Sequence, residues 1–128
     1  MIEVTAGVLI NDKKIFIAQR LNKMKFGGRW ELPGGKIEIG ENGEQCIIRE
    51  LEEELGIKVE KLKHFLTVEH SYPNISVRLF SYVIEEWNGK INLKEHQAMK
   101  WVSIKEAIES DILEADLPVL KSLLESSS

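Results

Sequence analysis

The 128-residue chain contains little of what marks several classes of protein. Cys46 is its only cysteine, so no internal disulfide can form, and a reducing compartment, the cytoplasm, is expected. No stretch reaches the roughly 18 apolar residues that cross a bilayer, so neither a spanning helix nor a membrane partner is expected. Internal repeats and linker-like Gly/Ser-rich or Pro-rich stretches are absent as well, which predicts one domain over residues 1–128.

An excess of positive charge is also absent. Seventeen Lys and Arg residues against 21 Asp and Glu residues give a formal net charge of −4, which disfavours stable binding of nucleic acid. The first ten residues lack a basic segment and include Glu3, which argues against a secretory signal. The composition, 43% hydrophobic and 30% charged, is typical of a globular domain, and a frayed end is expected at 125–128.

Local patterns predict more strands than helices. Alternating apolar residues over 2–10 predict a strand, and Asn11-Asp12 predicts a turn into a second strand at 14–18. Further strands are predicted at 30–32, 59–69, 75–86 and 99–102. Helices are predicted at 42–56, at 103–110 and from Leu117 onward. Because strands and helices do not alternate strictly, a mixed sheet flanked by helices, an α+β fold, is predicted.

The helix predicted at 42–56 has an acidic side next to its apolar side. Asn42 and Gln45 form a capping-box pattern at its start, and Gly56 suits its end. At about 100° per residue, four residues form an apolar stripe: Ile47, Ile48, Leu51 and Leu55. Three carboxylates lie together beside that stripe: Glu50, Glu53 and Glu54. The carboxylate of Glu52 points elsewhere.

Carboxylates at this spacing repel one another, which requires an explanation. A hard divalent cation such as Mg²⁺ or Mn²⁺ removes the repulsion, because these ions prefer oxygen ligands and are held by carboxylates together with substrate phosphates. The acidic run by itself favours the other interpretation, a solvated face of a stable helix. The residues on either side of the run decide between the two interpretations.

Gly35 is followed after five residues by Glu41, and after seven more by 49–57, which reads Arg-Glu-Leu-Glu-Glu-Glu-Leu-Gly-Ile. This segment resembles the Nudix hydrolase box, G-x5-E-x7-R-E-U-x-E-E-x-G-U with U apolar, at every fixed position. The resemblance implies the Nudix fold, an α/β/α sandwich in which helices flank a mixed, curved sheet and one helix is catalytic. It also implies a hydrolase that uses Mg²⁺, for which Mn²⁺ can substitute.

The resemblance assigns roles to the residues of the box. The implied metal ligands are a glycine carbonyl and four carboxylates: Gly35 (or Gly34), Glu50, Glu53, Glu54 and Glu95. The implied catalytic residues are Arg49, Glu50, Glu53 and Glu95. Either Glu50 or Glu53 is expected to take the proton from the attacking water. Arg49 can hold a carboxylate through a bidentate contact and fix its rotamer, and Glu41 is expected to reach back to the same ion.

Similarity to the MutT-type members of the family extends along almost the whole chain. It includes 6–8, 15–17, 30–33, 87–89, 94–95 and 101–103. It implies a pyrophosphohydrolase that converts a nucleoside triphosphate to the monophosphate and pyrophosphate. The expected role is removal of oxidised nucleotides such as 8-oxo-dGTP from the pool used for DNA synthesis, which links it to DNA repair. The implied substrate-binding residues are Arg20, Glu31, Leu32, Pro33, Gly34, Lys36, Ile75 and Asp116.

Asp116 departs from the bacterial MutT pattern, which has an asparagine there that reads the oxidised purine. An ionised Asp only accepts hydrogen bonds, which favours bases with an exocyclic amine such as cytosine. A protonated Asp in a dry pocket still donates. A CTP or modified-dCTP pyrophosphohydrolase is therefore the alternative, followed by a nucleotide-sugar or ADP-ribose hydrolase.

Other readings have less support. A ligand-binding regulator that lost catalysis usually has a broken box, whereas the box carboxylates are all present here. His64, His70 and His96 share no metal-binding spacing and are predicted at the surface or at a pocket rim. Cys46 is predicted to be a small packed residue. The expected oligomeric state is a monomer or a homodimer.

Overall fold

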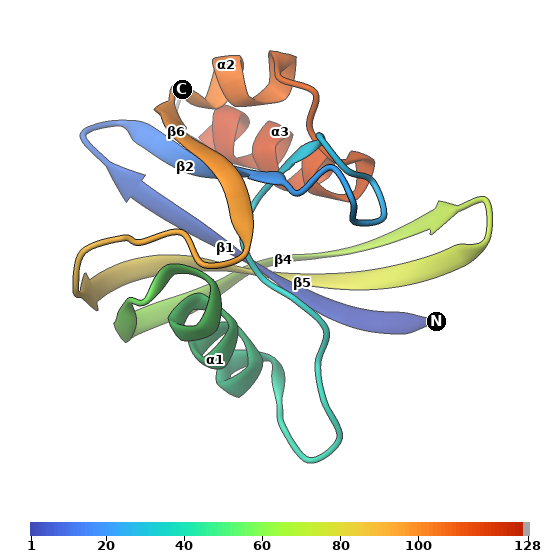
Figure 1. Ribbon diagram of the computed structural model, residues 1–128, viewed down its shortest axis with the longest axis horizontal. Helices are drawn as coiled ribbons and strands as arrows, with labels where there is room; N and C mark the ends of the chain where they lie inside the picture. Colours follow the sequence, from blue (N-terminus) through green and yellow to red (C-terminus); the bar gives the residue numbers. More distant parts are fainter. Residues whose placement is uncertain (127–128) are drawn as a thin grey trace.

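Three layers make up the computed structural model, which describes residues 1–126: helix α1 lies below the strands, and helices α2 and α3 lie above them (Figure 1). The elements are β1 (Ile2–Asn11), β2 (Lys14–Arg20), β3 (Trp30–Glu31), α1 (Gly43–Leu55), β4 (Lys58–Tyr72), β5 (Ile75–Asn88), β6 (His96–Val102), α2 (Ile104–Glu109), the 3-10 turn η1 (Glu114–Asp116) and α3 (Leu117–Ser126). The predicted mixed sheet with flanking helices is confirmed. No helix within the described residues has the length and apolar character needed to cross a membrane.

Strand β2 pairs with three other strands, β1, β3 and β6. The strand order is β3-β2-β1-β5-β4, and β6 pairs with β2 outside that path. Strands β1 and β5 run parallel over Ile2–Leu9, whereas β1 and β2 pair only beside their turn, at Ile10 and Asn11. Because β2 leaves β1 after two residue pairs, the rest of that edge pairs with β3, and β6 pairs along the opposite edge of β2. The ends of β2, β3 and β6 therefore come together.

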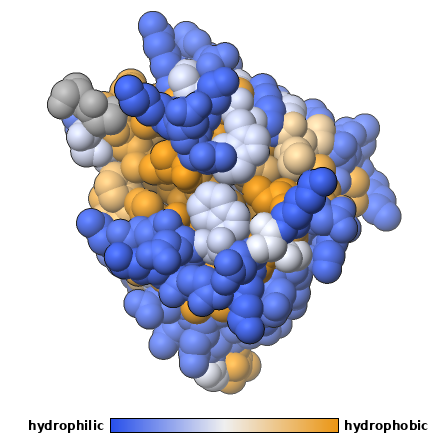
Figure 2. Space-filling view, turned by 90° about the vertical axis from the view of Figure 1, so that its left-hand side faces the viewer, coloured by the Kyte–Doolittle hydropathy of each residue, from blue (hydrophilic) through white to orange (hydrophobic). Residues whose placement is uncertain are grey.

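The strands have an apolar core on each face. Successive residues of β2 point to opposite faces. Ile15 and Ile17 pack in the cluster that includes residues of α2 and α3, and Phe16 and Ala18 pack in the cluster that includes residues of α1. On the face that Figure 2 shows, hydrophilic residues surround smaller apolar areas. The apolar contacts of the helices with the sheet lie in the two buried clusters.

Helix α1 is fixed at both ends and along one side. The predicted capping box of Asn42 and Gln45 is present, and Gly56 ends the helix in the left-handed region at φ 71°. Gly7 of β1 lets the helix approach closely, because a Cβ there would lie 3.3 Å from the Cδ1 atoms of Ile47 and Leu51. The sheet thereby holds the acidic side of α1 in a defined orientation.

Two expectations about helices are corrected. Ile48 is 36% exposed, whereas Cys46 is fully buried, so the buried stripe of α1 is turned from the predicted one. The thiol of Cys46 lies 3.3 Å from Thr5 Oγ1, which ties that side of the helix to β1 and confirms Cys46 as a packed residue. The frayed end is wrong for Glu125 and Ser126, which belong to α3, while 127–128 lie outside the described residues.

Candidate active site

Two adjoining pockets lie over the ends of β2, β3 and β6. The acidic pocket, of about 180 Å³, is lined by Arg20, Leu21, Met24, Glu31, Gly34, Gly35, Lys36, Glu50, Glu54, Glu95 and His96. The apolar pocket, of about 460 Å³, shares five of these residues: Arg20, Glu31, Gly34, Gly35 and Lys36. Its other lining residues are mostly apolar and include the predicted Leu32, Ile75 and Asp116. The five shared residues are the shared wall.

Most of the predicted site residues therefore lie around these two pockets, with three exceptions: Pro33, Arg49 and Glu53. Pro33 lines neither pocket; it is buried, and its carbonyl accepts a hydrogen bond from the Gly7 N–H at 2.7 Å. The expected contact of Pro33 with substrate is therefore not supported. Glu53 also lies outside both linings, with a half-exposed side chain bound to Arg49.

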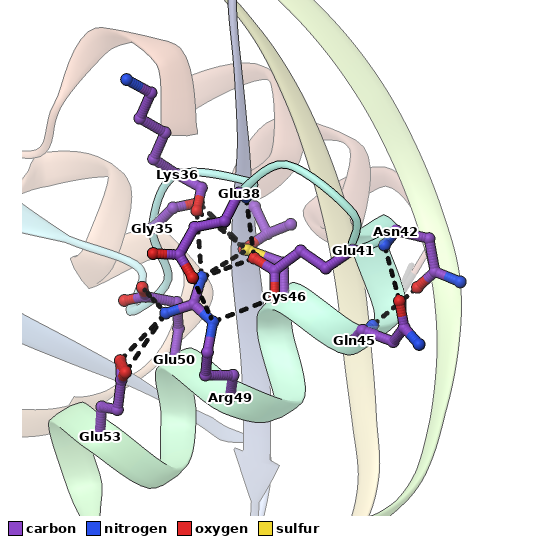
Figure 3. Close-up of polar contacts among 11 residues, drawn as sticks. Gly35, Lys36, Glu38, Glu41, Asn42, Gln45, Cys46, Arg49, Glu50 and Glu53 are labelled. Carbon is purple, nitrogen blue, oxygen red and sulfur yellow. Dashed lines mark hydrogen bonds and ion pairs between the residues drawn. The ribbon is translucent and has the colours of Figure 1, made fainter.

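Arg49 donates hydrogen bonds to three carboxylates at once, and its Nε also lies 3.4 Å from a fourth, that of Glu38 (Figure 3). Its Nη1 donates to Glu50 Oε1 at 2.7 Å and to Glu53 Oε2 at 3.0 Å. Its Nε and Nη2 donate to the two oxygens of Glu41 at 3.0 and 2.6 Å. The bidentate role predicted for Arg49 is thus present, and its acceptors join the 36–42 loop to α1.

Glu41 does not face an ion site, contrary to expectation. One of its oxygens also accepts the Glu38 N–H at 2.9 Å, so the loop backbone and Arg49 of α1 together occupy both oxygens. The hydrogen bonds from Arg49 and from the Glu38 backbone lower the pKa of Glu41 to about 2. Glu41 is a support for Arg49 rather than a ligand.

Glu54 is the carboxylate that Arg49 does not reach. Its side chain is 6% exposed, and Oε1 has no hydrogen-bond partner among the described residues. Burial, together with the nearby carboxylates of Glu50, Glu31 and Glu95, raises the pKa of Glu54 well above its usual value. The charge conflict predicted for the helix is therefore concentrated at one buried group in the acidic pocket.

The segment before β6 brings Glu95 to this pocket. The backbone N–H groups of Asn92 and Lys94 donate to the carbonyls of Leu55 and Glu54 at 2.9 and 3.0 Å. These bonds satisfy carbonyls at the end of α1 that lack helical partners. The last turn of α1 thus fixes the position of Glu95.

His96 is a site residue that the sequence analysis missed. Its side chain is only 4% exposed, and Nε2 lies 2.8 Å from Glu31 Oε2, so His96 is not at the open surface but in the lining of the acidic pocket. The strand was predicted to begin at Met99, whereas β6 begins at His96. Counting back in twos from Lys100 and Ala98 would have placed His96 on the wrong face, because the β2–β6 register shifts between Gln19 and Arg20 and interrupts the alternation.

Two glycines allow the backbone to approach the helix and β1. A Cβ on Gly35 would lie 2.4 Å from Glu50 Cδ, and one on Gly34 would lie 2.1 Å from the Thr5 carbonyl oxygen. The Gly35 carbonyl accepts from the Thr5 N–H at 2.8 Å and from Thr5 Oγ1 at 3.2 Å. This occupancy argues against the Gly35 carbonyl as a metal ligand and leaves Gly34, the alternative from the motif.

The donor set of the acidic pocket fits a divalent cation. No three His, Cys, Asp or Glu side chains in residues 1–126 are preassembled around one point. Arg49 draws Glu50 and Glu53 toward itself, which accounts for this. The unpartnered, buried oxygen of Glu54 beside other carboxylates is nevertheless the environment in which an oxygen-preferring cation relieves the most repulsion.

Asp116 is a buried residue in the lining of the apolar pocket. Its Oδ2 accepts the Leu32 N–H at 3.0 Å. Burial, and to a smaller extent the charge of Glu31, raises the pKa of Asp116 to about 8, against the opposing effect of the Leu32 hydrogen bond. At pH 7 this carboxyl is therefore mostly protonated and retains an O–H that can donate.

Comparison with known proteins identifies the family: the NUDIX domain matches residues 1–123. The chain belongs to the NUDIX family. It is 34% identical over 124 residues to the CTP pyrophosphohydrolase of Escherichia coli K12, covering 97% of this chain and 92% of that one. It is 33% identical over 123 residues to the 8-oxo-dGTP diphosphatase of the same organism, covering 95% of both chains. Among solved structures, the E. coli ORF135 protein is similar with a TM-score of 0.89 and 32% identity, covering 100% and 91% of the two chains. The protein is a MutT-like Nudix hydrolase.

The glycine contacts predict that alanine at Gly35 lowers activity but not stability, and that alanine at Gly40 lowers stability but not activity. Gly35→Ala places a methyl group against the Glu50 carboxylate, and we expect hydrolysis to fall at least about 100-fold with little loss of stability. Gly40→Ala is the matched control: its Cβ meets no atom within 4 Å, but its φ of 87° is unfavourable for alanine. It should cost about 1 kcal/mol of stability and leave hydrolysis unchanged. Rates and urea unfolding curves measure both; equal activities of the two variants would contradict the prediction.

The protonation of Asp116 leads to a pH-dependent prediction. Between its ordinary value of 3.8 and about 8, the native state holds a proton that the unfolded chain has lost. Stability should therefore fall as pH rises through this window, by up to about 1.4 kcal/mol per pH unit. Urea unfolding at pH 5, 6 and 7 should show this slope reduced in Asp116→Asn and retained in the control Asp12→Asn, which changes an exposed turn residue. Equal slopes in all three proteins would contradict it.

Proposed function

We propose that the enzyme hydrolyses a nucleoside triphosphate to the monophosphate and pyrophosphate, with an oxidised or modified nucleotide such as 8-oxo-dGTP as the preferred substrate. The observation that carries the proposal is the juxtaposition of the two pockets across the shared wall. The apolar pocket suits a base and sugar, and the acidic pocket suits a metal-bound polyphosphate. The names of the two E. coli relatives agree with this substrate class.

The basic residues of the shared wall are proposed to bind phosphate. Arg20 and Lys36 line both pockets, so a phosphate chain that passes from one pocket to the other lies beside them. Without these cations, the negative charge of the acidic pocket would repel the substrate. Glu31 lies in the same wall and pairs with Arg20 at 3.1 Å, which orients the guanidinium.

The carboxylates of α1 and of Glu95 are proposed to hold Mg²⁺, or Mn²⁺ in its place. Glu50, Glu54 and Glu95 line the acidic pocket, and Glu53 joins them if it turns from Arg49. When bound, such an ion neutralises phosphate charge and lowers the pKa of water. Glu50 or Glu53 accepts the proton as water attacks phosphorus in line, and Arg49 keeps both carboxylates at the edge of the site.

The protonation of Asp116 separates the two candidate bases. The protonated form donates to a base acceptor such as a purine carbonyl, whereas the ionised form accepts from the exocyclic amine of cytosine. With a pKa of about 8, the donating form predominates at pH 7, which favours the oxidised purine. CTP or a modified dCTP is the second candidate, because one relative is a CTP pyrophosphohydrolase and because Asp116 can ionise.

The proposal extends to the setting of the enzyme. A free, buried Cys46 is consistent with the reducing cytoplasm, where we propose that the enzyme acts on free nucleotides as a monomer or homodimer, without stable nucleic-acid binding. The net charge of −4 supports the last point.

A panel of triphosphates tests the proposed substrate class. We expect pyrophosphate release with Mg²⁺, and a higher kcat/KM for 8-oxo-dGTP than for CTP at pH 7. The ratio should fall as pH rises past about 8, because the donating form of Asp116 is lost. Asp116→Asn should keep activity but abolish that pH dependence of the ratio. Release of products other than pyrophosphate, as from a nucleotide sugar or ADP-ribose, would reject the proposal.

Two neighbouring glutamates test the acidic pocket. Glu54→Gln removes the buried carboxylate, and we expect turnover with Mg²⁺ to fall at least about 100-fold. Without metal, the same variant should be more stable at pH 7, because the unfavourable burial of this carboxyl group beside other carboxylates is relieved. Glu52→Gln, an exposed position on the same helix, is the control and should change neither. Full activity of Glu54→Gln would exclude the proposed role of Glu54 in holding the metal ion.

A further inference from the structure

A chain of polar contacts runs through the shared wall and ends at a residue outside the proposed machinery. His96 Nε2 lies 2.8 Å from Glu31 Oε2, and Arg20 Nη1 donates to Glu31 Oε1 at 3.1 Å. The exposed fractions of the three side chains are 4% for His96, 12% for Glu31 and 24% for Arg20. Because a carboxylate only accepts, His96 donates through Nε2–H. Each oxygen of Glu31 therefore has its own donor.

The strand register explains why these three side chains meet. Arg20 is opposite His96 in the β2–β6 pairing, and β3, which ends in Glu31, pairs with the other edge of β2. The register shifts between Gln19 and Arg20, where β6 has one extra residue, Gln97. Such a bulge redirects the side chains next to it. The Gln97 amide donates to the Arg20 carbonyl at 2.6 Å, which fixes the backbone at this point.

The guanidinium of Arg20 is held on two edges. Its Nε donates to the Lys25 carbonyl at 2.8 Å, and its Nη1 donates to Glu31. Two contacts on a planar group fix the orientation of its plane. Nη2 makes no hydrogen bond to any residue in 1–126 and remains able to donate to a ligand in the shared wall.

Glu31 itself needs a second donor to remain in place. It lies close enough to Glu54 to disfavour ionisation of that buried carboxylate, so carboxylate repulsion acts on Glu31 from the side of α1. His96 lies between them, with Nε2 at 2.8 Å from Glu31 and 3.8 Å from Glu54. Without the imidazole, Glu31 would lose one of its two donors and the spacer that separates it from Glu54.

We propose that His96 is a positioning residue for substrate: through Glu31 it holds the Arg20 guanidinium in the orientation that binds phosphate. The inference rests on the proposed function, in which Arg20 contacts the phosphate chain. It predicts that His96 affects substrate binding rather than turnover, because its effect passes through Arg20 and not through the acidic pocket.

A double-mutant cycle tests this path. His96→Leu removes the donor, and we expect it to raise KM for the best triphosphate of the panel about tenfold, with kcat changed less than about threefold. His96→Gln keeps an N–H near the position of Nε2 and should restore KM to within about threefold. In an Arg20→Met background, His96→Leu should have no further effect on KM. The exposed His64→Leu is the control and should leave both constants unchanged.

Two kinetic outcomes would overturn the proposal. An equal rise in KM from His96→Leu in the presence and absence of Arg20 would show that His96 does not act through it. A fall in kcat with KM unchanged would place its action at the acidic pocket instead. Thermal unfolding of each variant verifies that it is folded. If His96→Leu does not fold, the KM of His96→Gln still tests the proposal.

A ligand-free measurement keeps this inference separate from the proposed function. Hydrogen exchange of the Arg20 Nε–H, followed by NMR of the side chain, reports its bond to the Lys25 carbonyl. We expect exchange at least about tenfold faster in His96→Leu and unchanged in His96→Gln and His64→Leu. If the wild type releases no pyrophosphate from any triphosphate, the proposed function fails while this measurement still decides the positioning. Unchanged exchange in His96→Leu would overturn the positioning alone.

Discussion

The arrangement of charge around Arg49 is the constraint on which the site depends. One guanidinium binds Glu41, Glu50 and Glu53, so it offsets repulsion along the helix and fastens the 36–42 loop to it. Charge-assisted bonds of this kind are about twice as strong as neutral ones. Glu54 is left out of the arrangement, buried and with an unpartnered oxygen. The least favourable group in the cluster is therefore the one that faces the acidic pocket.

The sheet places both pockets relative to that helix. Strand β2 contributes alternate side chains to the two cores, and its end supplies Arg20 to the shared wall. Its neighbours β3 and β6 supply Glu31 and His96 to the same wall. A shift of β2 would therefore disturb the apolar pocket, the shared wall and the helix packing together. The strand β3 has only two residues, but it places Glu31 in the shared wall.

What could be predicted from the sequence was local. The capping box of Asn42 and Gln45 and the carboxylate face of the helix follow from the 3.6-residue period and from cap chemistry, and both are present. The errors lie where the answer depends on distant partners. The occupied carbonyl of Gly35 depends on Thr5, thirty residues away, and the burial of His96 depends on the register of β6 against β2. Neither the contact of the Gly35 carbonyl nor the burial of His96 is determined by residues that are adjacent in the sequence.

Glu31 links the chemistry of the two pockets. Its charge contributes to raising the pKa of both Glu54 and Asp116, so the acidic pocket and the base pocket share one electrostatic neighbour. A cation among the carboxylates would reduce the negative potential at this wall, and with it the cost of ionising Asp116. The hydrogen-bonding character of the base pocket is therefore not set by the identity of residue 116 alone. It depends on burial, on the Leu32 N–H and on the charge state of the neighbouring pocket, so the protonation of Asp116 is coupled to the carboxylates of the acidic pocket.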